Sequence, residues 1–317
     1  MSNLNTKKQK IWSQPIRVEC SDHPQLITSR TVNSRLWFVN NPKMEERILG
    51  FLAKYQQQYG VIIYAFVMVG NHYHLLAKFP LANRAAFCRD FNARIAEAAR
   101  YYVKSFGSGP LFGRRYTCQA IPTEKDLEDC FYYCALQPVS SGLSDRISGY
   151  PAYNSFQDAM NQRNRTYRVF RGEDYKNAKR KNPKTKALHY WSYYTLELSV
   201  LSTSESASDS QYKQQLLKQL ETRRLKLIDA RRSEGKGFCN KELLRKVKPG
   251  SLPKESKTGG RRPLVLTICP IARRKYLEWY FATVEAYRSA SHAFLAGNLE
   301  VDFPPGTYRP TCKVLAA

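Results

Sequence analysis

The chain has 317 residues, enough for one large domain or two moderate ones, and its 51 Lys and Arg against 26 Asp and Glu give a formal net charge of +25. This excess favours a polyanion partner, with nucleic acid first and an anionic membrane surface second. No apolar run is long enough to span a bilayer, and the first 15 residues are too polar for a secretory signal, so we expect a cytoplasmic protein with no membrane partner.

Eight cysteines occupy irregular positions without a Cys-x-x-Cys pair, which argues against a zinc ribbon or finger and fits a reduced cytosolic chain. Cys130 and Cys134 are one helical turn apart and could pair around a metal. More often, such residues fill the buried face of a helix as small apolar side chains.

The first half of the chain reads as alternating strands and helices after a flexible segment at residues 1–24. The order predicts an α+β fold with a ferredoxin-like (split β-α-β) antiparallel sheet, two helices on one face and a last helix available for the open face. The predicted elements are a strand with an irregular second half at 25–38, a helix at 44–59 ended by Gly60, a hairpin at 61–69 and 72–79, a helix at 83–104, a strand at 114–121, and a helix at 124–136 capped by Thr123.

The second half is basic and less regular. Residues 161–190 contain ten Lys and Arg against two Asp and Glu, which indicates a linker or an arm that orders on a polyanion. The aromatic stretch 189–201 could stack on bases, although a packed strand or helix edge is the commoner outcome. Helices are predicted at 211–232, with Leu216, Leu217 and Leu220 on the apolar side, and at 270–296, separated by a flexible basic loop at 248–263; a Pro-Gly turn follows at 303–310.

These observations predict a division into four parts: a flexible segment (1–24), a catalytic domain (25–158), a basic linker or arm (159–190) and a mainly helical region (191–317). Charge alone suggests that the last two parts bind nucleic acid. Deleting residues 161–317 is then expected to weaken binding selectivity and to preserve the chemistry.

The hairpin around Gly70-Asn71 carries the first candidate site. Alternate side chains of a strand share a face, so His72 and His74 point one way, while Tyr73 and Leu75 point the other way with Ala77 and Phe79. The second set makes a core face. The two imidazoles lie side by side on the opposite face, where a divalent metal could bridge them, although single strand histidines are usually core or solvated residues.

A second candidate group lies on the helix at 124–136. Tyr133 and Gln137 are four residues apart and lie on the same side, and Pro138 then ends the helix. Two imidazole nitrogens and the neutral oxygen of Gln137 would leave metal positions open for a phosphate oxygen and water. Tyr133 is then a possible nucleophile, but Tyr132 competes with it on another face, and the residues alone leave the choice open.

These motifs resemble those of a known family. GNHYHLL at 70–76 is similar to the His-hydrophobe-His motif of the HUH endonucleases. The YCALQPV segment at 133–139, followed by Gly142-Leu143, Gly149-Tyr150-Pro151 and Ser155, resembles the tyrosine segment of REP-associated tyrosine transposases and single-tyrosine insertion-sequence transposases, as Gly113-Arg114-Arg115-Tyr116 resembles the strand before it. The resemblance covers about residues 25–156 and identifies Tyr133 as the catalytic tyrosine.

The resemblance implies cleavage and rejoining of single-stranded DNA at hairpins through a 5′-phosphotyrosine, with Mg²⁺ or Mn²⁺ bound by His72, His74 and Gln137. Gln137 stands where REP-associated proteins usually have Asn, but it is similar to the third ligand of simpler insertion-sequence transposases. Ser140-Ser141 replaces a usual arginine. Relatives act as monomers or homodimers, some with the tyrosine supplied by a partner subunit. The predicted DNA contacts are Arg30, Lys78, Arg114, Arg115, Arg165, Arg168, Lys179 and Arg180.

Two other possibilities remain open. A non-catalytic nucleic-acid-binding module could use the same open sheet face, as four-stranded sheet modules do. A domesticated relative could cleave without mobilising itself.

Overall fold

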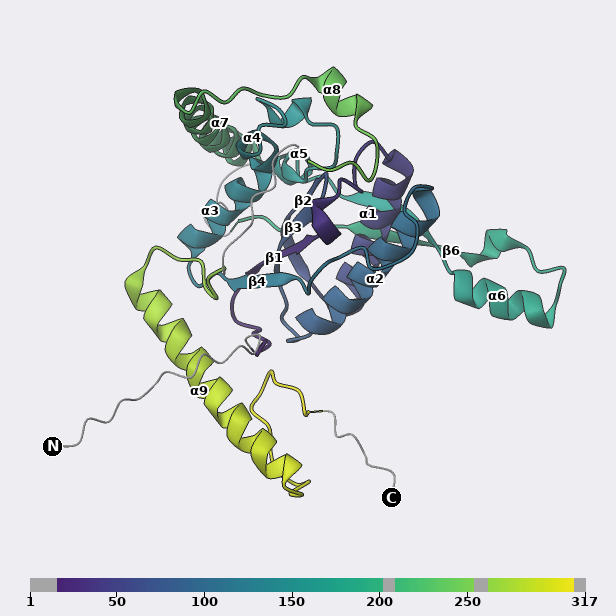
Figure 1. Ribbon diagram of the computed structural model, residues 1–317, viewed down its shortest axis with the longest axis vertical. Coiled ribbons are helices and arrows are strands. Elements are labelled where there is room, and N and C mark those ends of the chain that lie inside the picture. The colour runs from purple at the N-terminus through teal and green to yellow at the C-terminus, as the bar shows by residue number, and fades with distance from the viewer. Residues whose placement is uncertain (1–15, 202–208, 254–261, 311–317) are drawn as a thin grey trace. The chain divides into compact units, whose positions relative to one another are not determined.

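A four-stranded antiparallel sheet forms the centre of the computed structural model, which describes residues 16–201, 209–253 and 262–310 (Figure 1). Its strand order is β2-β3-β1-β4, and each neighbouring pair is antiparallel. The strands alternate with two helices in the chain order β1-α1-β2-β3-α2-β4. The bounds are Gln25–Arg30 for β1, Ile62–Val69 for β2, His72–Lys78 for β3, Thr117–Ala120 for β4, Pro42–Tyr59 for α1 and Arg84–Tyr102 for α2.

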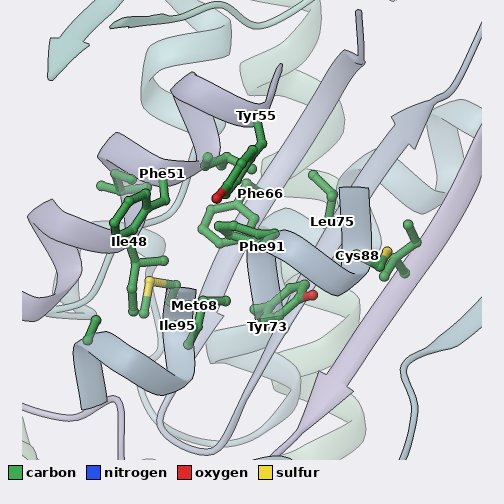
Figure 2. Close-up of a cluster of buried hydrophobic side chains, with 14 of the residues drawn as sticks. Ile48, Phe51, Tyr55, Phe66, Met68, Tyr73, Leu75, Cys88, Phe91 and Ile95 are labelled. Carbon is green, nitrogen blue, oxygen red and sulfur yellow. The ribbon is translucent and has the colours of Figure 1, made fainter. Parts of the chain in front are cut away.

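Helices α1 and α2 cover one face of this sheet. The α1 helix begins where the Asn41 side chain accepts a hydrogen bond from the Met44 amide, and it ends at Gly60, whose left-handed backbone (φ 60°) is accessible to glycine without strain. The predicted core face of β3 is confirmed, because Tyr73, Leu75, Ala77 and Phe79 are all buried against these helices. Figure 2 shows Phe66 of β2 and Phe91 of α2 within this cluster, with ring centroids 6.1 Å apart.

The opposite face of the sheet is also covered, in part by the helix that the sequence predicted to be available for it. Leu26, Val67 and Leu76 point to this side and share a hydrophobic cluster with side chains from four helices. A β-bulge between Ile63 and Ala65 shifts the register of β2, so that Ala65 joins this second cluster. The helices are α3 (Glu124–Ala135), α4 (Gln137–Ser140), α5 (Phe156–Met160) and α7 (Asp209–Ser233).

Residues 165–196 form a hairpin arm, which contains a strand pair where the sequence indicated a weakly periodic linker. Strand β5 (Arg165–Phe170) pairs with β6 (Trp191–Leu196), and helix α6 (Gly172–Lys181) lies between them. The arm is anchored on α1, because Val169 and Leu196 are buried in the α1–α2 core. The α1 backbone approaches the arm closely at Gly50, where an added Cβ would lie 3.2 Å from Val169.

The chain divides into two compact units, Cys20–Leu277 and a second unit that combines Met1–Glu19 with Glu278–Ala317. In the second unit, the Tyr280 hydroxyl donates to the Ile16 carbonyl at 2.6 Å, and the Glu19 amide donates to the Gly306 carbonyl at 2.8 Å. Val18 is buried, so the described part of the predicted flexible segment is packed. Residues 1–15, 202–208, 254–261 and 311–317 lie outside the described part of the chain.

The remaining elements are short, apart from helix α9. Helix α9 (Pro270–Leu295) confirms the predicted aromatic helix, whereas the predicted strand at 25–38 is regular only to Arg30. No helix within the described ranges is both long and apolar enough to cross a bilayer. The others are η1 (Val32–Ser34), η2 (Ile147–Gly149), η3 (Ala187–Tyr190) and α8 (Lys241–Lys246).

Candidate active site

The two histidines of β3 lie side by side on the sheet face that α3 covers. Their ring centroids are 4.9 Å apart, and the rings are nearly perpendicular. His72 is 6% exposed and His74 is 1% exposed, so both imidazoles are withdrawn from solvent. Their cross-strand neighbours on β1 are Arg30, opposite His72, and Thr28, opposite His74.

One nitrogen of each imidazole is held by a hydrogen bond. The Asn71 amide nitrogen donates to the Ser34 carbonyl at 2.9 Å, which leaves Asn71 Oδ1 as the acceptor 2.6 Å from Nδ1 of His72. Thr28 Oγ1 lies 2.8 Å from Nδ1 of His74. These bonds leave Nε2 of each ring available to bind a metal. A histidine that binds a metal through one nitrogen characteristically has a hydrogen-bond partner on the other.

Burial keeps both histidines neutral. Desolvation, followed by the charges of Arg262 and Arg30, lowers the pKa of His74 to about 3. Desolvation also lowers the pKa of His72 well below its ordinary value, with smaller contributions from His74 and the same two arginines. Neutral imidazole is the form that binds a metal, so the pair presents ligating nitrogens without having to lose a proton at neutral pH.

Helix α3 brings a tyrosine to this pair. The helix begins at the predicted cap, because the Thr123 side chain accepts a hydrogen bond from the Asp126 amide. Near the other end of the helix, the Tyr133 ring lies 5.4 Å from the His74 ring, measured between centroids, at an interplanar angle of 80°. Tyr133 is 44% exposed, so its phenol lies at the boundary between the buried histidines and solvent.

Gln137 joins the group from the first turn of α4. Its side chain is buried, its amide nitrogen donates to the Tyr133 carbonyl at 3.3 Å, and it lies within hydrogen-bonding reach of His74 and the Tyr133 side chain. Pro138 sits in the first turn of α4, where a missing amide costs no helical bond. The structure therefore brings together the four predicted site residues, His72, His74, Tyr133 and Gln137, within one chain.

Packing distinguishes the two tyrosines between which the sequence left the choice of nucleophile open. Tyr132 is 1% exposed and lies in the hydrophobic cluster between the sheet and α7, with the Arg223 guanidinium 4.7 Å from its ring centroid. Tyr132 therefore has a packing role. Only Tyr133 of this pair faces the histidines.

Besides Arg30, a second arginine lies beside Tyr133, and the sequence analysis did not identify it. Arg262 is exposed and lies within hydrogen-bonding reach of the Tyr133 side chain. Burial raises the pKa of Tyr133 above its ordinary value, and Arg262 acts in the opposite direction. Arg262 belongs to the predicted flexible basic loop at 248–263, where no sequence signal distinguishes it from the other basic residues.

The predicted DNA contacts fall into separate groups. Arg30 faces the site, and Arg114 and Arg115 are exposed in the segment before β4 that runs along the same end of β1. Lys78 lies at the far end of β3, about 13 Å along the strand from His74 at ~3.3 Å per residue. The other four predicted contacts belong to the hairpin arm, which packs on the opposite layer: Arg165, Arg168, Lys179 and Arg180.

Arm residues differ in how free they are to bind a phosphate. Arg165 forms two hydrogen bonds with the buried carboxylate of Asp158, at 2.6 and 2.9 Å, so its guanidinium is already paired. Arg168 stacks over the Trp191 ring at 4.9 Å, and Lys179 lies 5.6 Å from the Tyr175 ring centroid. These stacked cations remain exposed, as does Arg180.

Other candidate metal groups are not formed. Cys130 and Cys134 are buried in the hydrophobic cluster, and burial raises the pKa of the Cys130 thiol to about 12, so both act as packing residues. Among the described residues, no group of three His, Cys, Asp or Glu side chains is arranged to hold a metal ion. The predicted metal set differs from such a group because its third member is the amide oxygen of Gln137.

Comparisons with known proteins show a distant likeness to solved structures. No protein-family model matches the sequence, and no curated protein matches it. Among solved structures, the chain is similar to a REP-associated tyrosine transposase bound to a REP hairpin, with 18% sequence identity and a TM-score of 0.40. The likeness covers 46% of this chain and 84% of that chain.

Proposed function

We propose that the protein is a transposase-type enzyme that cleaves and rejoins single-stranded DNA at hairpins, with Tyr133 as the nucleophile. The observation that carries this proposal is the convergence of the β3 histidines with the tyrosine of α3, whose ring lies 5.4 Å from that of His74. A phenol at the edge of a buried pair of neutral imidazoles has the components of metal-assisted phosphoryl transfer.

The donor set fits a divalent cation such as Mg²⁺ or Mn²⁺. His72 and His74 would each contribute Nε2, since Nδ1 of each ring is held by Asn71 or Thr28. Gln137 would contribute Oε1, since its amide nitrogen is held by the Tyr133 carbonyl. The bound ion would polarise the scissile phosphate and stabilise the charge that develops on it.

The chemistry needs no external energy source. The Tyr133 hydroxyl oxygen forms a bond to phosphorus, the bond from phosphorus to O3′ breaks, and the phenolic proton ends on the released 3′-hydroxyl. A 3′-hydroxyl of another strand then attacks the 5′-phosphotyrosine, and the proton returns to Tyr133. The phosphodiester energy is stored in the protein–DNA bond between the two steps.

The sheet supports the same proposal. The order β2-β3-β1-β4, with α1 and α2 on one face and α3 on the face that carries the histidines, is compatible with the proposed ferredoxin-like arrangement. The alternative binding module would use an exposed sheet face. That face is buried beneath α3, α5 and α7, which counts against such a module.

Covalent capture tests the proposal. Single strands from the DNA flanking the coding region, each containing an imperfect hairpin, are incubated with the protein and Mn²⁺, and denaturing electrophoresis reports a protein–DNA adduct. Tyr133→Phe should abolish the adduct and leave DNA binding intact, because it removes only the attacking oxygen. Tyr132→Phe is the matched control, since it makes the same change one residue away in the packed core, and it should retain the adduct.

Absence of an adduct with the wild-type protein on every hairpin strand, in both Mg²⁺ and Mn²⁺, would overturn the proposal in favour of non-catalytic binding. An adduct that persists in Tyr133→Phe but disappears in Tyr132→Phe would move the nucleophile to the other tyrosine.

A further inference from the structure

The segment that follows residue 261 extends the central sheet at its β4 edge. The Leu264 carbonyl accepts a hydrogen bond from the Ala120 amide at 2.9 Å, and the Leu266 amide donates to the Ala120 carbonyl at 2.8 Å. Val265 forms a parallel bridge with Ala120. The Gln119 side chain adds a bond to the Pro263 carbonyl at 3.1 Å. These bonds fix the backbone immediately after Arg262.

The same segment is also tied to the tyrosine helix. The Ile268 amide donates to the Asp126 carboxylate in the first turn of α3, at 3.3 Å. Arg273 donates to the Thr267 carbonyl at 2.8 Å, which holds the end of the segment against α9. The segment that carries Arg262 is therefore held by hydrogen bonds to both β4 and α3.

Arg262 and Arg30 place two positive charges around the same phenol. Arg30 lies opposite His72 across the β1–β3 pair, and Arg262 lies within hydrogen-bonding reach of the Tyr133 side chain. Two neighbouring guanidinium groups repel each other, and an anion held between them would relieve that repulsion.

On the basis of the proposed function, we propose that Arg262 and Arg30 bind the non-bridging oxygens of the phosphate that Tyr133 attacks. A guanidinium presents a planar fork of N–H donors that matches two phosphate oxygens, which a lysine ammonium does not reproduce. Arg30 reaches the phosphate from β1, and Arg262 reaches it from the segment that bonds to the β4 edge. The catalytic centre then includes a residue outside the predicted catalytic domain at 25–158.

The test compares Arg262→Gln, Arg262→Lys and the wild type in two assays with the same hairpin-bearing strands. The first measures the rate of adduct formation at saturating DNA and Mn²⁺. Loss of a donor to transition-state charge should lower this rate about 100-fold in Arg262→Gln, and Arg262→Lys should recover only part of it. The second measures how the DNA dissociation constant changes with salt. Loss of one phosphate contact should reduce the slope for single-stranded DNA by ~0.7.

Arg89→Gln provides the matched control, because Arg89 is an exposed arginine on α2 whose side chain pairs with Asp90 at 2.7 Å. This variant should match the wild type in both assays. A wild-type rate and salt slope in Arg262→Gln would overturn the assignment of Arg262 while leaving the proposed function intact. If the wild type forms no adduct, the proposed function fails, and the salt slope still decides whether Arg262 contacts a phosphate.

Discussion

In each site histidine, a hydrogen bond to Nδ1 leaves Nε2 available to bind a metal, and the two partners come from different parts of the chain. Asn71 precedes His72 in the turn, whereas Thr28 reaches His74 across the β1–β3 pair. The period of two in β3 was sufficient to predict that the imidazoles share a face. The sequence could not identify Thr28 as a partner, because that contact depends on strand register.

Thr28→Val should weaken metal binding without disturbing the fold. The substitution nearly preserves side-chain shape but removes the oxygen 2.8 Å from His74 Nδ1. Loss of such a partner typically lowers metal affinity about 10–100-fold. Isothermal titration with Mn²⁺ measures the change. Ser29→Ala is the control, because Ser29 points to the other face and donates to the Tyr73 hydroxyl. Equal Mn²⁺ affinities for Thr28→Val and the wild type would contradict the assigned ligand geometry.

The buried histidines should make stability depend on pH. The folded-state pKa of His74 is about 3, and that of His72 is also well below the ordinary value of 6.5. Below about pH 6.5 the unfolded chain binds protons that the folded chain does not, so the free energy of unfolding falls as pH decreases, by up to ~1.4 kcal/mol per pH unit for each histidine.

Urea unfolding at about pH 7.5 and about pH 5 measures this linkage. A double variant, His72→Gln with His74→Gln, should lose much of the pH dependence, since glutamine does not titrate. The same dependence in the double variant and the wild type would show that other groups cause it.

At the scale of elements, helix α7 braces the segment that carries the site. Arg223 pairs with Asp129 of α3 at 2.6 Å, and Arg231 donates to the Ser140 carbonyl at 3.3 Å and to the Gly237 carbonyl at 2.7 Å. Periodicity predicted the α7 helix and its apolar Leu216 and Leu220, but it was wrong for Leu217, which is exposed. No pattern in the sequence predicted that this helix would pack beside the tyrosine helix.

Gly142→Ala should disturb this brace. Gly142 has φ +69°, and an added Cβ would overlap the Arg231 guanidinium, which would have to leave its carbonyl partners. Gly235→Ala is the control, because Gly235 has φ +67° and no atom within 4 Å of the added Cβ. Both variants should lose about 1–2 kcal/mol from the left-handed backbone alone. Gly142→Ala should lose more, as measured by denaturant unfolding, and equal losses would show that Arg231 moves aside freely.

The arm illustrates an element that periodicity could not reveal. Strands β5 and β6 satisfy each other's backbone groups, and Val169 and Leu196 alone provide their fully buried apolar anchors. One anchor in each strand gives no alternation to detect in a strongly basic segment. The helices α1, α2, α3 and α9 were predictable because each carries its apolar residues at helical spacing.

For the whole molecule, the site and the basic arm lie on opposite layers of the sheet. The proposed test by deletion of residues 161–317 is therefore unsuitable. Val169 and Leu196 fill the core beneath α1, and Tyr212 and Leu216 fill the core beneath α3, so the deletion would open both. Point substitutions on the arm separate DNA binding from folding.

A triple variant, Arg168→Gln with Lys179→Gln and Arg180→Gln, should weaken binding of hairpin DNA and reduce its salt dependence. These three side chains are exposed and lie on the opposite layer from Tyr133. The adduct rate at saturating DNA should match that of the wild type. Fluorescence anisotropy in a salt series and adduct kinetics measure the two quantities. Unchanged affinity would show that the arm does not contact DNA.

The bridge between Ala120 and Val265 has a consequence for biosynthesis. Arg262 leaves the ribosome about 130 residues after Tyr133, a delay of roughly 10 s at ~5–20 residues per second. During that interval the nascent chain already holds the histidines and the phenol but lacks the guanidinium. Under the proposed function, a chain made in this order completes its phosphate-binding pair only after Arg262 has been translated.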